Sequence, residues 1–338
     1  MFYPIIAKCL MLMDPEKAHD LTLRFLKESA NTPLSYLYSQ SLNSNKINLM
    51  GLEFPNPIGL AAGLDKDGEA IDAFLKMGFG HVEVGTVTPE PQLGNARPRM
   101  FRIKSKKALI NRLGFNNKGV DNLIVNLKSR KSKGLVGVNI GKNKKTSLED
   151  SKFDYLVCLE KVYPHASYVT VNVSSPNTRE LRSLQYGEML DELLDALKDK
   201  QHKLSRIHGF YVPLTLKVSP DLSEEEVVRI ARKLVEYQID AVVATNTTVK
   251  RDSISGLPLF DEAGGLSGPP LRELSNGVIS RLSKEIGEAL PIIGVGGINS
   301  VSDASDKLNL GAKLLQLYTG LIYSGPKLLK AITDLYRL

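Results

Sequence analysis

From residue 55 onward, short apolar segments rich in β-branched residues alternate with segments of helical periodicity. Such alternation predicts βα units whose strands form a parallel sheet. Eight units in roughly 280 residues predict an α/β fold of the (β/α)8 TIM-barrel class. The eight predicted strands begin at Ile58, His81, Leu135, Tyr168, Leu214, Asp240, Pro291 and Ala312.

Residues 1–40 have a different pattern, so we divide the chain into an N-terminal helical segment, 1–40, and a barrel domain, 41–338. The run FYPIIAKCLMLM holds about twelve residues, whereas a membrane-spanning helix needs roughly 20. Asp14 and Pro15 then have the features of an N-cap and a first helical residue. We expect two short amphipathic helices, which either pack on the main domain or lie in a membrane interface.

Two long excursions interrupt the alternation. We expect residues 89–117 to form an inserted hairpin that carries polar groups over the barrel mouth. Residues 249–271 form a Gly-rich connection. Loops of this length in a compact domain are often functional.

The chemistry of the predicted strands gathers at their carboxyl ends, where TIM barrels hold their active sites. A doubly wound sheet would also place ligands there, but its first strand is expected to lead into GxGxxG, and GLDKDGEA follows here. The barrel is therefore favoured. The eight strand ends are AGLDK, GTVTP, NIGKN, NVSSPNT, KVSP, TNTT, GVGGI and LYTG.

Composition and charge narrow the classes of function. The chain is 42% hydrophobic and 24% charged, which is a globular balance. Its net charge of +7 includes seven Lys or Arg and no acid between residues 128 and 145. Because no aromatic residue is interleaved there, we expect a solvated helix end and loop and no nucleic-acid groove. Cys9 and Cys158 have neither disulfide-framework nor metal-ligand spacing.

Glycine-rich ends follow the last two predicted strands. GVGGI (294–298) and LYTG (317–320) occupy positions where this fold commonly binds a phosphate. Tight packing is the alternative explanation for these glycines. Because Gly268 also falls on the predicted mouth, we favour a phosphorylated ligand, and FMN fits better than NAD in the absence of a dinucleotide fingerprint.

Polar residues at the predicted mouth indicate a planar, amide-bearing substrate. Lys217 lies in an otherwise apolar strand and requires a partner, either a flavin or a barrel acid such as Glu83. Each asparagine amide offers donors and an acceptor, although any single one could be a turn residue. The asparagines are Asn111, Asn139, Asn172, Asn177 and Asn246.

The predicted mouth is poor in histidine, so the general base must be another group. Ser175, in NVSSPNT, is the hydroxyl in the right place. Without a histidine partner it would depend on Thr178 or water as a relay, and a turn hydroxyl ahead of Pro176 is the alternative.

Across essentially the whole chain, these motifs occur in the order found in one family. The order is AAGLDK, GTVTP, NRLGFNN, NVSSPNT, the strand with Lys217, TNTT, GGLSG, GVGGI and LYTG. The sequence resembles the class 2 dihydroorotate dehydrogenases, which are quinone-dependent and membrane-associated. The resemblance implies FMN bound by Ala62, Gly63, Leu64, Asp65, Lys66, Thr86, Asn139, Asn172, Lys217, Thr245, Gly268, Gly297, Tyr318 and Thr319. It implies dihydroorotate bound by Lys66, Asn111, Arg112, Leu113, Gly114, Phe115, Asn172, Asn177, Asn246 and Thr247.

The resemblance also implies the chemistry. Ser175 matches the base that takes the C5 proton while hydride leaves C6 for the flavin, which gives orotate for pyrimidine biosynthesis. Class 1 enzymes carry a cysteine in this role. The rival is another FMN barrel, such as a tRNA dihydrouridine synthase, which would be expected to carry a catalytic cysteine at the mouth.

For the electron acceptor, the resemblance implies ubiquinone or a related quinone, bound beneath the two N-terminal helices. His19, Arg102 and Tyr318 match residues of the family's quinone site. The implied location is the cytoplasmic side of a bacterial inner membrane, as a peripheral protein. One departure is Arg179 and Glu180, where the family usually has a small residue and glycine. The loss of that glycine removes an expected hinge.

Overall fold

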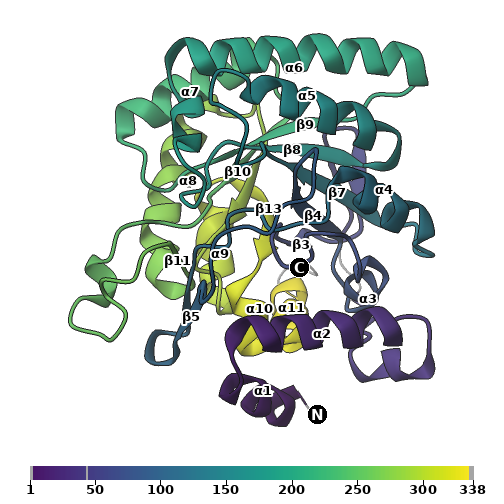
Figure 1. The fold of residues 1–338 in the computed structure, drawn as a ribbon, viewed down its shortest axis with the longest axis vertical. Coiled ribbons are helices and arrows are strands. Elements are labelled where there is room, and N and C mark those ends of the chain that lie inside the picture. Colours follow the sequence, from purple (N-terminus) through teal and green to yellow (C-terminus); the bar gives the residue numbers. More distant parts are fainter. Residues whose placement is uncertain (1–2, 43–44, 335–338) are drawn as a thin grey trace.

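The computed structural model describes residues 3–42 and 45–334, and eight parallel strands close a barrel in the order β10-β12-β13-β3-β4-β7-β8-β9 (Figure 1). All eight predicted strands are present, so the predicted barrel class is confirmed. Phe2 and residue 338, the end of the predicted barrel domain, lie outside the described residues. The barrel strands are β3 (Ile58–Leu60), β4 (His81–Val87), β7 (Leu135–Ile140), β8 (Tyr168–Asn172), β9 (Leu214–Val218), β10 (Ala241–Ala244), β12 (Ile292–Val295) and β13 (Ala312–Leu317).

Helices cover the outside of the barrel and bury an apolar side against it. In α7 (Glu224–Glu236), the Ser223 side chain accepts from Glu226 N, and Glu226 caps the Ser223 backbone in return. This is the reciprocal capping box that fixes a helix start. The other helices of this layer are α3 (Ile71–Lys76), α4 (Val120–Ser129), α5 (Ser151–Val162), α6 (Gly187–His208), α8 (Arg272–Ile286), α9 (Val301–Asn309), α10 (Thr319–Ser324) and α11 (Pro326–Thr333).

The inside of the barrel is divided into an apolar part and a polar part. Val243, Ile293 and Leu314 belong to an apolar cluster, which Phe54 joins from a hairpin of β1 (Ile47–Leu49) and β2 (Leu52–Phe54). Phe54 contacts His81 at the start of β4, with ring centroids 5.2 Å apart. The hairpin therefore packs at the amino ends of the strands, and sequence analysis did not predict it. The polar part is made of Glu83, Asn139, Tyr168, Thr170 and Lys217, all buried.

The two excursions meet in one small sheet. β5 (Met100–Ile103) and β6 (Ala108–Asn111) form the predicted hairpin in residues 89–117. β11 (Gly265–Ser267), from the second excursion, pairs antiparallel with β6. This third strand has three residues and was not predicted, because its partner residues are 154–158 positions away in sequence.

The basic stretch is split between the two ends of β7. Lys128 lies in the last turn of α4, and the other basic residues lie in the loops before and after β7. Lys142 donates to the Thr146 carbonyl at 2.8 Å. The stretch is a helix end and two loops, as expected, but Lys142 is buried and is not solvated.

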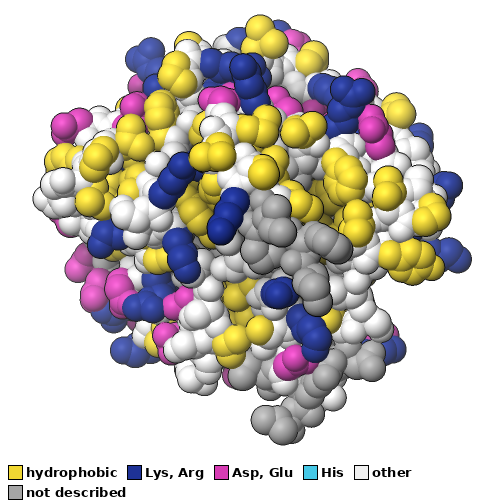
Figure 2. Space-filling model, turned by 90° about the horizontal axis from the view of Figure 1, so that it is seen from below, with side chains coloured by type: hydrophobic (Ala, Val, Ile, Leu, Met, Phe, Trp, Pro, Cys, Tyr) yellow, Lys and Arg dark blue, Asp and Glu magenta, His cyan; other side chains and the backbone are white. Residues whose placement is uncertain are grey.

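The two predicted N-terminal helices are α1 (Tyr3–Leu12) and α2 (Pro15–Ser29), and the Asp14 carboxylate caps α2 by accepting from Glu16 N and Lys17 N. Figure 2 views the molecule from the side on which α1 and α2 lie in Figure 1, and apolar side chains with several Lys and Arg among them spread over that face. No helix in the described ranges has the length and apolar character required to cross a bilayer. Exposed apolar residues of this segment are Ile6, Leu12, Met13, Leu21, Phe25, Leu34, Tyr36 and Leu37.

Candidate active site

A cavity opens at the carboxyl ends of the barrel strands, and we call it the mouth cavity. It brings together most of the residues predicted for the cofactor and the substrate, although they come from nine strands and the segments that follow them. The predicted residues that line it are Ala62, Gly63, Lys66, Thr86, Asn111, Leu113, Gly114, Phe115, Asn172, Ser175, Asn177, Lys217, Thr245, Asn246, Thr247, Gly268, Gly297, Tyr318 and Thr319.

Four predicted residues are not among the lining residues. Asp65 accepts from Glu69 N and Ala70 N, both at 2.8 Å, and burial raises its pKa to about 6. Leu64 packs in the outer core, and the Arg112 guanidinium lies 4.7 Å from the Phe101 ring centroid and pairs with Glu262. Asn139 is fully buried and holds Thr86 from behind. These four support the cavity wall.

Several lining residues were missed in the sequence. Gln316 lies within the apolar strand AKLLQLY, and this is the same signal that singled out Lys217 in its strand. Ser267 contacts the Thr319 hydroxyl at 2.8 Å, but no local pattern indicates this, because the short strand β11 places it there. Leu271 and Gln316 were missed altogether, whereas the remaining lining residues belong to the AAGLDK, GGLSG, GVGGI and LYTG motifs but were not assigned to a ligand: Ala61, Ser267, Val295, Gly296, Ile298 and Gly320.

Glycine loops after β12 and β11 form one wall of the mouth cavity. At Gly297, with φ +77°, an added Cβ would lie 2.5 Å from Arg272, and at Gly268, with φ +92°, 2.6 Å from the Lys107 carbonyl. Packing therefore requires these glycines, as the alternative explanation expects. The same lack of side chains leaves backbone N–H groups as the donors available to a phosphate.

Lys217 is buried, with 5% of its surface exposed, yet its ammonium has no hydrogen bond or salt bridge to another residue of the described chain. The alternative partner, a salt bridge to Glu83, is not formed in the described structure, where Asn139, Tyr168 and Gln316 donate to that carboxylate. Burial lowers the pKa of Lys217, and the nearby charge of Glu83 opposes this. A buried ammonium without a contact partner fits an electron-rich ligand such as a flavin.

The charged side chains that line the mouth cavity in the described structure are those of Lys66 and Lys217. Carboxylates and histidines are absent from this lining set. Burial lowers the pKa of Lys66 to about 8, although Asp67 opposes this shift. The cavity therefore favours anionic ligands.

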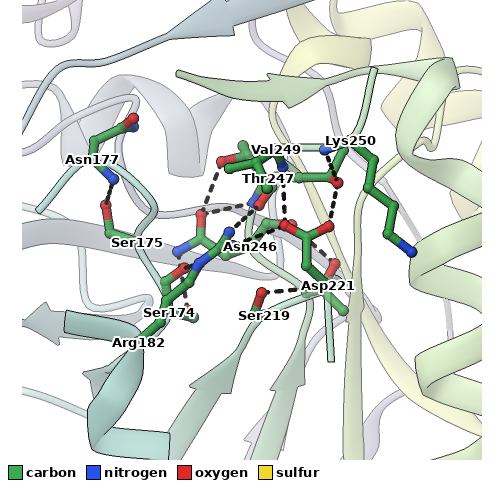
Figure 3. Close-up of polar contacts among 12 residues, drawn as sticks. Ser174, Ser175, Asn177, Arg182, Ser219, Asp221, Asn246, Thr247, Val249 and Lys250 are labelled. Carbon is green, nitrogen blue, oxygen red and sulfur yellow. Dashed lines mark hydrogen bonds and ion pairs between the residues drawn. The ribbon is translucent and has the colours of Figure 1, made fainter. Parts of the chain in front are cut away.

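Ser175 lines the mouth cavity, and its Oγ accepts a hydrogen bond from Asn177 N at 3.2 Å (Figure 3). This contact is the turn interaction that the alternative explanation expects. A backbone N–H in this position stabilises negative charge on the oxygen that it contacts. Thr178 is not among the lining residues.

Arg182 connects three loops at the mouth (Figure 3). Its guanidinium donates to the Ser174 carbonyl at 3.2 Å, to the Thr247 carbonyl at 3.0 Å and to Asp221 at 2.8 Å. Asp221 also accepts from Val249 N at 2.9 Å. The loops after β8, β9 and β10 are thus joined behind Ser175, and sequence analysis missed this connection.

A second cavity of about 600 Å³ lies between α2 and the barrel, and we call it the helix cavity. His19 and Tyr318 line it, while Arg102 is not in its lining and donates to the Met13 carbonyl at 2.6 Å. Burial and the charge of Lys66 lower the pKa of His19 to about 3, so the imidazole is neutral. Lys66, Leu113 and Tyr318 line both cavities, which therefore share a wall.

Helix α2 is attached beside the helix cavity by Glu16. This carboxylate is buried and pairs with Arg99 at 2.6 Å and with Arg97 at 3.0 Å. Burial alone would raise the pKa of Glu16, but the two guanidinium groups lower it overall.

A closed (β/α)8 barrel with two lysines, several asparagines and glycine loops at its mouth defines a barrel protein with a site for anionic, amide-bearing ligands. A family model described as dihydroorotate dehydrogenase matches residues 44–336. The chain belongs to the dihydroorotate dehydrogenase family.

Relatives with known names cover the N-terminal helices as well. A Shewanella loihica protein named dihydroorotate dehydrogenase (quinone) is 59% identical over 337 residues, which are 100% of this chain and 99% of that protein. A protein of the same name from Shewanella halifaxensis is 58% identical over 100% of both chains. The crystal structure of Eimeria tenella DHODH in complex with ferulenol has a TM-score of 0.88 at 35% identity, and covers 96% of this chain and 93% of that one.

Proposed function

We propose that this protein is a quinone-dependent dihydroorotate dehydrogenase, which oxidises (S)-dihydroorotate to orotate in de novo pyrimidine biosynthesis. The observation that carries the proposal is the shared wall of the two cavities. The mouth cavity offers two lysines to anionic ligands, and it meets the helix cavity at Lys66, Leu113 and Tyr318. Two adjacent sites with a common wall suit an enzyme that passes electrons from one substrate to another through a bound cofactor.

FMN is the cofactor that fits the mouth cavity, where it would accept the hydride. Lys217 supplies an unpaired ammonium for the ring, and the loops with Gly268 and Gly297 supply backbone donors for the phosphate. Thr86, Asn172 and Thr245 would hold the ring from the strand ends. Leu64, Asp65 and Asn139 support these residues from outside the cavity.

Dihydroorotate carries a carboxylate and a ring with two amide groups. Lys66 is suited to the carboxylate, while the amides of Asn111, Asn177 and Asn246 are suited to the ring. Ser175 would remove the C5 proton, and Asn177 N would stabilise its oxygen. Because Thr178 is outside the lining, a water molecule is the relay that we propose for the proton.

A quinone ring would bind in the part of the helix cavity that is lined by the neutral His19, Leu113 and Tyr318, because most of the other lining residues are charged. The apolar side chains exposed on the N-terminal segment would lie in the lipid interface, so that a lipid-soluble quinone enters from the membrane. We place the protein on the cytoplasmic side of a bacterial inner membrane, as a peripheral protein.

The function is tested with the purified protein and a panel of electron acceptors. The protein should be yellow from bound flavin, and dihydroorotate should reduce ubiquinone but neither fumarate nor NAD. A colourless protein, or one that reduces fumarate or NAD in preference to quinone, would contradict the proposal.

A tRNA dihydrouridine synthase is not favoured. Cys9 is exposed on α1 and Cys158 is buried on α5, so neither cysteine lies at the mouth. The full-length relatives carry the dihydroorotate dehydrogenase name.

A further inference from the structure

We propose that Glu83 is a positioning residue of the flavin site: it orients Gln316 so that the Gln316 carbonyl accepts an N–H of the cofactor, and its charge lowers the flavin's reduction potential. This inference rests on the proposed function. Gln316 was not among the residues predicted to bind the cofactor.

Glu83 lies on β4 inside the barrel and is fully buried. Its carboxylate accepts from Asn139 Nδ2 at 2.8 Å, Tyr168 Oη at 3.1 Å and Gln316 Nε2 at 2.7 Å. An ionised carboxylate can only accept hydrogen bonds. The amides of Asn139 and Gln316 must therefore turn their NH2 groups toward Glu83.

In this orientation the Gln316 side-chain carbonyl points away from Glu83. Gln316 lines the mouth cavity and is 1% exposed, and its Oε1 is buried without a hydrogen-bond partner in the described structure. A buried acceptor without a partner costs about 1–3 kcal/mol. The pyrimidine part of a flavin carries a ring N–H beside two carbonyl groups, so it can satisfy Gln316 and Lys217 along one edge.

Glu83 also fixes the orientation of the Asn139 amide, which in turn orients other residues of the site. Because the Asn139 NH2 faces Glu83, its Oδ1 accepts from Thr86 at 2.5 Å and from Asn172 at 3.2 Å. The Asn172 Oδ1 then faces Asn246 Nδ2 at 3.3 Å. A carboxylate at the base of the barrel thus fixes three amides in sequence, up to a residue that lines the mouth cavity.

The charge of Glu83 acts on the flavin independently of this orientation. Glu83 interacts electrostatically with Lys217 without contact, so it offsets part of the positive charge that the site presents. A reduced flavin carries more negative charge than an oxidised one. Removal of the Glu83 charge should therefore favour reduction, whereas general damage to the site would have no fixed direction.

The experiment compares Glu83→Gln and Gln316→Met with the full-length wild type, each reconstituted with FMN. We expect Glu83→Gln to shift the equilibrium toward reduced flavin by roughly tenfold, which is about 30 mV for two electrons, measured against a redox dye. We expect Gln316→Met to raise the Kd for FMN roughly threefold to tenfold, measured by flavin fluorescence, because one buried hydrogen bond is lost.

Asp72→Asn is the matched control, because Asp72 is a buried carboxylate on α3 that accepts from Lys131 N and Ser132 N outside the barrel. It should leave the potential and the Kd unchanged. A wild type that binds no FMN would refute the proposed function itself. If wild type binds FMN, an unchanged or lower potential in Glu83→Gln, or an unchanged Kd in Gln316→Met, would overturn this inference alone. Should Glu83→Gln not fold, the Kd of Gln316→Met still decides.

Discussion

The mouth cavity and the helix cavity share a wall, but they are built in different ways. The mouth cavity is bounded by strand ends of a closed barrel, and side chains such as Asn172 and Ser175 are buried in fixed hydrogen bonds. The helix cavity is bounded by α2, which is attached through the buried Glu16–Arg99 pair and through surface contacts such as Lys27–Glu69.

This difference separates two requirements of a two-substrate redox enzyme. Proton and hydride transfer require groups fixed at a stated geometry, and a closed barrel provides that rigidity. Entry of a lipid-soluble substrate requires a wall that can move, and α2 is joined to the barrel by side-chain contacts such as Glu16–Arg99 and Lys27–Glu69 and is not part of the closed sheet. Changes on one side of the shared wall should therefore spare the half-reaction on the other.

Deletion of residues 1–40 should separate the two half-reactions most strongly. The deletion removes Glu16 and His19 from the helix cavity but no residue that is unique to the mouth cavity. We expect quinone reduction to be abolished, while dihydroorotate still bleaches the flavin in a stopped-flow experiment. Circular dichroism checks that the barrel folds. Unchanged quinone kinetics would show that the helices do not form the acceptor site.

The opposite separation should follow Ser175→Ala. Loss of a general base typically costs about 10²–10⁴ in rate, so flavin reduction by dihydroorotate should fall by that factor at neutral pH. FMN content should not change, and chemically pre-reduced flavin should still reduce quinone at the wild-type rate. Ser219→Ala is the control, because the Ser219 hydroxyl accepts from Asp221 N near the same loops but does not line the cavity. Wild-type flavin reduction in Ser175→Ala would place the base elsewhere.

Glu16→Gln tests the attachment of α2 without deleting it. Breaking a buried ion pair costs about 3–5 kcal/mol, so α2 should loosen and the KM for quinone should rise while flavin reduction by dihydroorotate is spared. Glu288→Gln is the control, because it breaks the exposed Lys313–Glu288 pair, whose residues line neither cavity, and such pairs contribute at most about 1 kcal/mol. Equal quinone kinetics in both variants would show that Glu16 does not hold the helix cavity.

The sequence predicted more of the mouth cavity than of the helix cavity, and the reason is physical. The eight strands and the position of Ser175 at the mouth followed from local periodicity and from the rule that barrel sites lie at strand ends, whereas the role of Ser175 as a base came from the family resemblance. The Glu16–Arg99 pair joins residues 83 apart, and Arg182 joins three loops. Side-chain geometry across such distances has no local signature. Gln316 is the exception, because a polar residue in an apolar strand was visible in the sequence.

Lys66, on the shared wall, should make substrate binding depend on pH. Burial lowers its pKa to about 8 in the free protein, against the opposing charge of Asp67; Arg99 lowers it further, while Glu16 and Asp20 also oppose the shift. Below pH 8 the ammonium is charged and attracts a carboxylate; above pH 8 the charge is lost. The Kd for orotate, measured by its perturbation of the flavin spectrum, should therefore rise as pH increases beyond 8. The Lys66→Met variant should bind orotate more weakly, and its Kd should no longer depend on pH in this range. If its Kd rose with pH as in the wild type, a group other than Lys66 would be responsible.

The smallest effect should come from Glu180, which occupies a left-handed conformation with φ 56° and ψ 2° in the loop after β8. A non-glycine residue in this conformation destabilises the folded protein by about 1 kcal/mol. Substitution by glycine removes this strain, but the greater freedom of glycine in the unfolded chain offsets part of the stabilisation. Glu180→Gly should therefore stabilise the protein by less than about 1 kcal/mol in urea unfolding.

Turnover should change less than twofold in Glu180→Gly, because Asn177 donates to Asn111 on one side of this position and Arg182 is bonded to Asp221 on the other. Glu180→Ala is the control: it keeps the strained conformation and loses the exposed ion pair with Arg179, so it should not gain stability. If the glycine variant instead lost stability and the alanine variant lost as much, the Arg179–Glu180 pair would outweigh the backbone conformation. The Arg179–Glu180 ion pair would then stabilise the loop at the position where the family usually has a conformationally flexible glycine.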